Sequence, residues 1–157
     1  MTSNARPLPS APQPNPAEMQ AEYTFSLRRL RTLLPLAKGA WVLAVYQDGA
    51  TLRLMLEALR QSLAPLLVRE VSLLNCTPDP LAILRSLPAE ESQSVVVFTD
   101  IDDALPELCG YLDSQREALA RLPQRLLFGV TPDEQHIMAE HAPNFYSRVS
   151  GIFPFHA

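Results

Sequence analysis

The sequence predicts an α/β fold: a three-layer sandwich in which helices cover both faces of a five-stranded, mainly parallel sheet. Two observations carry this prediction. Short, continuous apolar runs such as residues 41–46 and 94–98 are typical of strands that are buried on both faces of a parallel sheet. Segments with helical periodicity alternate with these runs, and parallel strands require helical crossovers of this kind.

The first 22 residues are expected to form a disordered tail, followed by a single domain over residues 23–157. Five prolines between residues 7 and 16 remove backbone hydrogen-bond donors from a stretch that has little to bury. Apolar residues then recur at helical spacing over residues 25–36, with arginines between them. This pattern predicts an amphipathic helix that ends near Pro35 and Gly39.

The remaining elements alternate in type. Strands are expected over residues 41–46, 67–74, 94–98, 126–130 and 149–155. Asp48 is placed to cap the helix after the first strand, and Thr131 begins a capping box with proline at the first helical position. Two further helices are expected from the leucines between residues 81 and 87 and between residues 105 and 122. Pro154 confines the last strand to an edge of the sheet.

The composition is that of one globular domain with a packed core. The chain has 157 residues, of which 47% are hydrophobic and 19% are charged. A net charge of -4 disfavours nucleic-acid binding, since neutralising phosphates needs a concentrated basic surface.

No apolar run has the length of a signal peptide or a membrane span, so we expect a cytoplasmic protein. A single lysine among many Ala, Leu and Pro residues is typical of a GC-rich bacterial genome. Cys76 and Cys109 lack the spacing of a metal or redox pair and are expected to be buried.

Polar side chains follow the first and third strands, at the edge of the sheet where ligands bind in this fold class. They are Gln47, Asp48, Gly49 and Thr51 after the first strand, and Asp100 and Asp102 after the third. A P-loop needs several glycines, a lysine for the outer phosphates and a hydroxyl for magnesium. This loop keeps one glycine and a threonine, and the single lysine, Lys38, precedes the first strand. We therefore interpret the six positions as a degenerate nucleotide site with no catalytic residue, no cofactor and no metal. Asp102 or Asp103 is expected to cap the helix that follows.

Two alternatives use the same acids. In the first, Asp100 and the turn over residues 48–51 form a nucleotide-binding switch without a standard P-loop. In the second, the run Asp100-Ile101-Asp102-Asp103 resembles the nucleophile motif of haloacid-dehalogenase-type phosphatases. That resemblance implies phosphorylation of Asp100 and acid–base catalysis by Asp102, but no lysine follows in the rest of the chain.

A second candidate site lies near the carboxyl terminus. Phe145, Tyr146 and Arg148 combine two aromatic rings with an arginine in an expected loop, a composition typical of protein interfaces. Packing of the two aromatic side chains in the core is an alternative of equal weight.

Taken in order, these segments resemble the degenerate nucleotide-triphosphatase modules of the STAND class, found in bacterial signalling and conflict-system proteins. The resemblance covers residues 24–155 and rests on five patterns: the helix before the first strand, the eroded loop 47–51, the acidic third strand, the strand 126–130 and the ending 144–153. It implies the sheet order 5-1-4-3-2 and an adaptor role from which nucleotide hydrolysis has been lost. We therefore expect a non-catalytic protein-binding module, a small regulatory subunit or scaffold for a separate protein encoded nearby. Self-association stays open.

Overall fold

The fold is built on a sheet of five parallel strands. The computed structural model of the chain describes residues 16–91 and 93–155. Its strands are β1 (Trp41–Tyr46), β2 (Val68–Ser72), β3 (Val95–Thr99), β4 (Arg125–Val130) and β5 (Gly151–Phe155). They are arranged in the order β2-β3-β4-β1-β5, and every pairing is parallel. Read from β5, this is the expected order 5-1-4-3-2, so the predicted α/β sandwich is confirmed.

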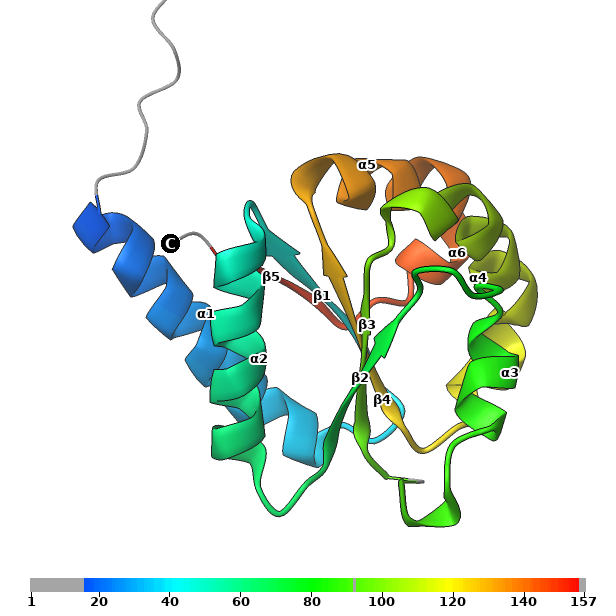
Figure 1. Cartoon of the computed structure of the whole chain (residues 1–157), viewed down its shortest axis with the longest axis horizontal. Coiled ribbons are helices and arrows are strands. Elements are labelled where there is room, and N and C mark those ends of the chain that lie inside the picture. Colours follow the sequence, from blue (N-terminus) through cyan, green and yellow to red (C-terminus); the bar gives the residue numbers. More distant parts are fainter. Residues whose placement is uncertain (1–15, 92, 156–157) are drawn as a thin grey trace, which may run out of the picture.

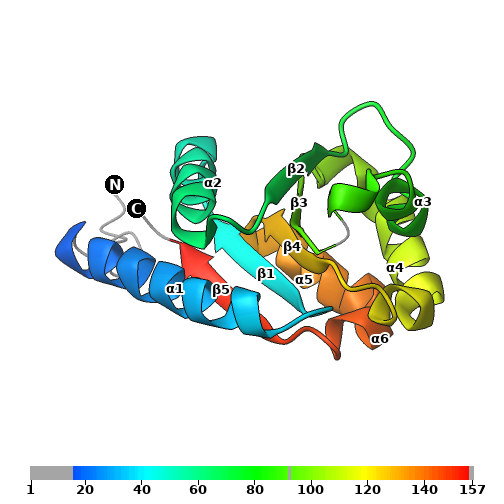
Figure 2. The same cartoon turned by 90° about the horizontal axis from the view of Figure 1, so that it is seen from below.

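Helices cover both faces of the sheet (Figures 1 and 2). One face carries α1 (Pro16–Leu36) and α2 (Gly49–Leu63). The other face carries α3 (Pro80–Arg85), α4 (Leu105–Ala120), α5 (Pro132–His141) and α6 (Pro143–Tyr146). Short 3-10 turns at Ala89–Glu91 and Asp102–Ala104 complete the described elements. This layering explains why β1, β3 and β4 are almost wholly buried, as their continuous apolar runs predict.

Alternate residues of each strand face opposite layers. Val42 and Ala44 of β1 pack with α1 and α2 residues, whereas Leu43 and Val45 pack with residues of α4 and α5. The same alternation in β3 places Val97 on the α2 face and Phe98 on the α4 face. The same alternation therefore assigns each residue at the end of these strands to one face of the sheet or the other.

Helix α1 begins at Pro16, well before the expected start at residue 25. Residues 16–22, assigned to the tail from the sequence, are therefore helical, whereas residues 1–15 of that expected tail lie outside the described part of the chain. Leu30 and Leu34 of α1 have no exposed surface. They pack in the core between α1, α2 and the α2-facing side of the sheet, which fixes this helix to the body of the domain.

Candidate functional site at the carboxyl edge of the sheet

The connection between β1 and α2 contains two residues, Gln47 and Asp48, before the helix starts at Gly49. Asp48 caps the helix: its Oδ1 atom accepts hydrogen bonds from the backbone N–H of Thr51 at 2.8 Å and from the Thr51 hydroxyl at 3.0 Å. The bond from the Thr51 N–H, followed by that from its hydroxyl, lowers the pKa of the Asp48 carboxyl below its usual value. In P-loop proteins, a phosphate occupies the amino end of the equivalent helix. Here an internal carboxylate takes that place.

Asp100 follows β3 in a strained backbone conformation. Its φ is 54°, in the left-handed region that aspartate adopts more readily than most residues. The Asp100 carboxylate accepts a hydrogen bond from the hydroxyl of Ser72, the last residue of β2. The Leu73 N–H also donates to the Thr99 carbonyl at 2.9 Å, so β2 and β3 stay connected beyond their last paired residues. Asp100 thus has a structural partner at the position where a metal ligand or nucleophile would stand.

Asp102 and Asp103 do not form the helix cap expected from the sequence. The 3-10 turn starts after Ile101 and α4 starts after Ala104, and neither helix end has a side-chain cap. Both aspartates are exposed in the first turn of this helical segment. Negative charge there is favourable because helix amino ends carry partial positive charge.

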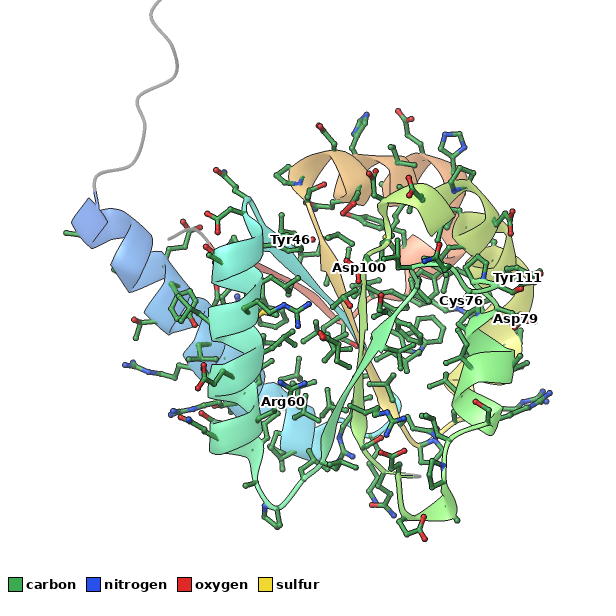
Figure 3. The ribbon with its side chains drawn as sticks, in the orientation of Figure 1. Tyr46, Arg60, Cys76, Asp79, Asp100 and Tyr111 are labelled. Atoms are coloured by element: carbon green, nitrogen blue, oxygen red, sulfur yellow. The ribbon has the colours of Figure 1, made fainter. Side chains whose placement is uncertain are left out.

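Tyr46, which the sequence analysis did not single out, ends β1 at the same edge of the sheet as Asp100, which follows β3 (Figure 3). Burial raises the pKa of its phenol most, and the negative charges of Glu134, Asp100 and Asp102 raise it further. Arg53 acts in the opposite direction. However, the Nη1 atom of Arg53 donates to both carboxylate oxygens of Glu70 on β2, so the Arg53 charge is already paired.

Glu134 belongs to the capping box predicted at the start of α5. Its carboxylate accepts the Thr131 N–H at 3.0 Å, and its own N–H donates to the Thr131 hydroxyl at 3.3 Å. The Thr99 hydroxyl, by contrast, is fully buried and has no hydrogen-bond partner within the described residues. Strand alternation places it on the α2 face, the face that Tyr46 also occupies.

Metal and lysine chemistry have little support at this edge. Among the described residues, no group of three or more His, Cys, Asp and Glu side chains could hold a metal ion. The single lysine, Lys38, lies in the turn before β1, whereas Asp100 follows the carboxyl end of β3. Six residues of β1 separate these two edges of the sheet by about 20 Å. Lys38 therefore cannot act beside Asp100.

The predicted interface residues near the carboxyl terminus require one correction. Phe145 is completely buried: its ring stacks on Trp41 at 4.7 Å between centroids and meets Phe128 edge-on at 5.4 Å. The expected loop contains α6, which packs against α4 and α5 and draws this ring into the core. Phe145 therefore cannot contact a partner at the surface.

Tyr146 and Arg148 remain candidates for that surface. Tyr146 is half-buried, and its hydroxyl accepts a hydrogen bond from the Gln135 amide at 3.2 Å. Arg148 is exposed and forms an ion pair with Glu117 of α4 at 2.6 Å.

The two cysteines differ in a way that the sequence did not predict. Cys109 is buried in the core, and burial raises the pKa of its thiol to about 11. Cys76 is exposed in the loop after β2, against the expectation that both would be buried.

Comparison with known proteins finds similarity in structure alone. No family model and no curated protein matches the sequence. Eight chains of solved structures match the fold. One is the ORC2 protein of Aeropyrum pernix in its ADP form, with a TM-score of 0.52 and 15% identity over 97% of this chain and 50% of that chain. The same protein in its ADPNP and ADP complexes gives a TM-score of 0.46 and 16% identity over 88% of this chain and 46% of that one.

The chain has a P-loop NTPase-like fold. It spans about half the length of these ORC2 structures. At 15% identity the likeness concerns the fold and not the ligand. None of the helices in the described part of this NTPase-like domain is long and apolar enough to cross a membrane.

Proposed function

We propose that the chain is a non-catalytic protein-binding module, an adaptor or small regulatory subunit that acts on a separate protein. In this proposal it is a degenerate NTPase-like domain of the STAND type, and the six edge positions are remnants of a nucleotide site. The observation that carries the proposal is the Asp48 carboxylate at the amino end of α2. It accepts the Thr51 N–H, one of the backbone donors that would bind a phosphate, and its charge repels a phosphate.

Two further features support the loss of catalysis. Phosphoryl transfer depends on positioning and charge neutralisation of the phosphates, which a two-residue connection without lysine or glycine repeats cannot provide. Arg53, a cation that acts on Tyr46 at this edge, is already paired with Glu70. A phosphatase based on Asp100 is not supported either, because Lys38 lies at the opposite edge of the sheet.

Titration of the pure protein with ATP or GTP and magnesium tests the proposal. We expect neither heat of binding nor a saturable thermal shift. The matched variant is Asp48→Asn, which keeps a capping oxygen and removes the negative charge. It should also fail to bind, because the phosphate loop itself is absent. A saturable shift of several degrees in the wild-type protein would refute the adaptor proposal.

One observation favours a second candidate, a nucleotide-binding switch without a standard P-loop. The buried Thr99 hydroxyl has no partner within the described residues, and such groups are ordinarily hydrogen-bonded. If it served a bound nucleotide, Thr99→Val would abolish a thermal shift that the wild-type protein shows. The same titration therefore separates the two candidates.

A further inference from the structure

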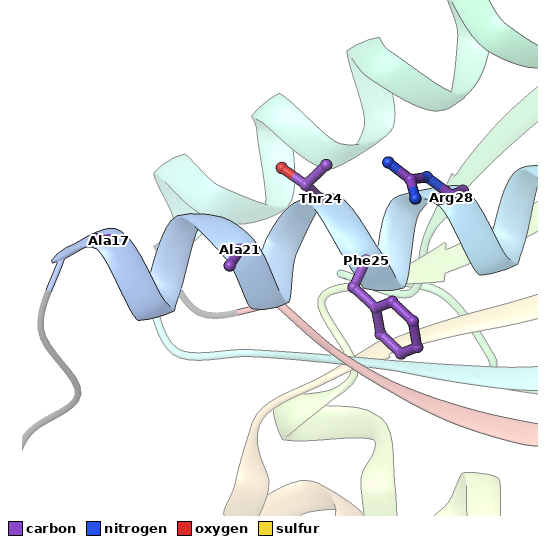
Figure 4. A pocket seen from close by; sticks show the side chains of 5 residues that line it. All are labelled: Ala17, Ala21, Thr24, Phe25 and Arg28. Carbon is purple, nitrogen blue, oxygen red and sulfur yellow. The ribbon is translucent and has the colours of Figure 1, made fainter.

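Two adjoining hollows run along the outer side of α1. The first, of about 460 Å³, is lined by Ala17, Ala21, Thr24, Phe25 and Arg28 (Figure 4). The second, of about 470 Å³, shares Arg28 and continues over Leu33, Leu36 and Phe153. We call this surface the α1 groove. It extends from Ala17 to Leu36, about 30 Å at the rise of an α-helix.

The α1 groove exposes two large apolar side chains, one in each hollow. Phe25 is 58% exposed and Leu36 is 83% exposed. Single exposed apolar residues are common on protein surfaces, but here each lines one of two connected hollows. The first hollow is bordered by small side chains at helical spacing, Ala17, Ala21 and Thr24, which allow another helix to approach closely.

From Thr24 onward this surface is basic, although the chain as a whole is acidic and α1 carries Glu18 and Glu22 before that point. Residues 24–36 contain Arg28, Arg29 and Arg31 and no acidic residue, and all three arginines are exposed. The Arg29 guanidinium lies 5.6 Å from the centre of the Phe25 ring and 5.0 Å from that of Phe153. A guanidinium that packs on aromatic faces keeps its in-plane N–H groups available for carboxylates. Arginine beside an exposed aromatic ring is a composition typical of hot spots in protein interfaces.

The α1 groove is better suited to bind a protein than a membrane surface. An interfacial helix inserts a continuous apolar face, but Leu30 and Leu34 of α1 are fully buried against the body of the domain. What remains exposed is a basic surface with two separated apolar residues. Charge complementarity therefore favours a partner segment that presents carboxylates beside apolar side chains.

We propose that the α1 groove binds an amphipathic helix of a partner protein that carries Asp and Glu residues beside its apolar stripe. This inference rests on the proposed function as a protein-binding module and names the surface and the class of partner. Apolar side chains of that helix lie against Phe25 and Leu36, and its carboxylates accept hydrogen bonds from Arg28 and Arg29.

The test uses two designed peptides of about 20 residues, the length of the groove. Both carry leucines at helical spacing; one has glutamate at the flanking positions and the other has lysine. Each is titrated into the full-length protein and binding is followed by fluorescence anisotropy. We expect saturable binding of the glutamate peptide, weakened by added salt, and no binding of the lysine peptide.

Variants locate the binding surface. Replacing both Arg28 and Arg29 by glutamate should weaken binding of the glutamate peptide by about tenfold or more. Phe25→Ser, at a mostly exposed position, should weaken it about threefold or more without reversing charge. Arg85→Glu, on α3 in the opposite layer, is the matched control and should leave the affinity within about twofold. Circular dichroism melts establish that each variant is folded.

Several outcomes would overturn the inference. They are no saturable binding of the glutamate peptide, equal binding of the lysine peptide, or equal affinity in all folded variants. A dimer of the wild-type chain that dissociates in the Phe25→Ser variant, measured by light scattering, would assign the surface to a second copy instead. None of these results bears on nucleotide binding, so the proposed function fails separately, through the ATP and GTP titrations.

Discussion

Arg125 holds the carboxyl end of α1 against the sheet, and its replacement provides a sharp test of the structure. The side chain is 3% exposed, and its guanidinium donates to the carbonyl oxygens of Leu34, of Pro35 at 2.9 Å and of Gln93 at 2.6 Å. Helix α1 has no basic residue in its own last turn. Arg125 therefore supplies, from β4, the positive charge that helix carboxyl ends favour.

The change Arg125→Met keeps most of the apolar stem and removes the donors. Charge-assisted hydrogen bonds contribute about 1.5 to 3 kcal/mol each when buried, but two of these three are only partly buried and water can replace them. The substitution also removes the desolvation cost of a buried charge, which offsets part of the lost stability. We expect a net decrease of about 3 kcal/mol in the free energy of unfolding, or about 6 to 12 °C in Tm.

Equilibrium urea unfolding, followed by circular dichroism, measures this change. Arg121→Met is the control, because Arg121 is exposed and its replacement should change the free energy of unfolding by less than about 0.5 kcal/mol. A loss of under about 1 kcal/mol for Arg125→Met, with an unchanged denaturant slope, would refute the anchoring role.

Three further predictions concern single side chains. Phe145→Ala should lower the free energy of unfolding by about 4 kcal/mol, because it removes a buried ring between Trp41 and Phe128; a loss below about 1 kcal/mol in urea unfolding would place Phe145 at the surface after all. In a thiol titration of the native protein at pH 8, Cys76 should react within seconds and Cys109 only after unfolding, because Cys109 is buried and the pKa of its thiol is raised to about 11; two fast thiols would contradict this burial. The pKa of the Asp48 carboxyl is lower in the folded state than in the unfolded state, where it is about 3.9. The ionised carboxylate therefore stabilises the fold fully above the unfolded-state pKa, and this stabilisation is lost as the pH falls through the folded-state pKa. The difference in Tm between wild type and Asp48→Asn should therefore shrink on acidification in that range, and a difference that grows would show the opposite sign of shift.

The parts of the fold that depend on local sequence were predictable. Strand β1 has the predicted bounds and helix α5 starts at the predicted capping box, because strand burial and helix caps are encoded by adjacent residues. The boundaries of β2 were less well predicted: residues 67–74 were expected and Val68–Ser72 are observed. Leu67 and Leu74 are apolar but exposed at its two ends, so hydrophobicity alone overestimated this strand.

The features that depend on distant contacts were not predictable. Phe145 is buried because Trp41, at the start of β1, presents a ring for it to stack on. Arg125 looks like any other arginine in the sequence, and its burial follows from the carbonyl oxygens at the end of α1 that surround it. In both cases the partner lies about 90 residues or more away along the chain, beyond the reach of any periodicity.

The structure also changes what the acidic edge means for function. Asp48 accepts hydrogen bonds from Thr51, Asp100 accepts one from Ser72, and Glu134 accepts one from Thr131. Each of these carboxylates is engaged by its own chain, and ligand binding there would have to break those bonds first. Arg29 of the α1 groove differs, because its guanidinium packs over the Phe25 and Phe153 rings, and a stacked guanidinium keeps its in-plane N–H donors available. In the proposed binding mode the partner therefore contacts α1, away from the edge where an NTPase-like fold ordinarily binds its ligand.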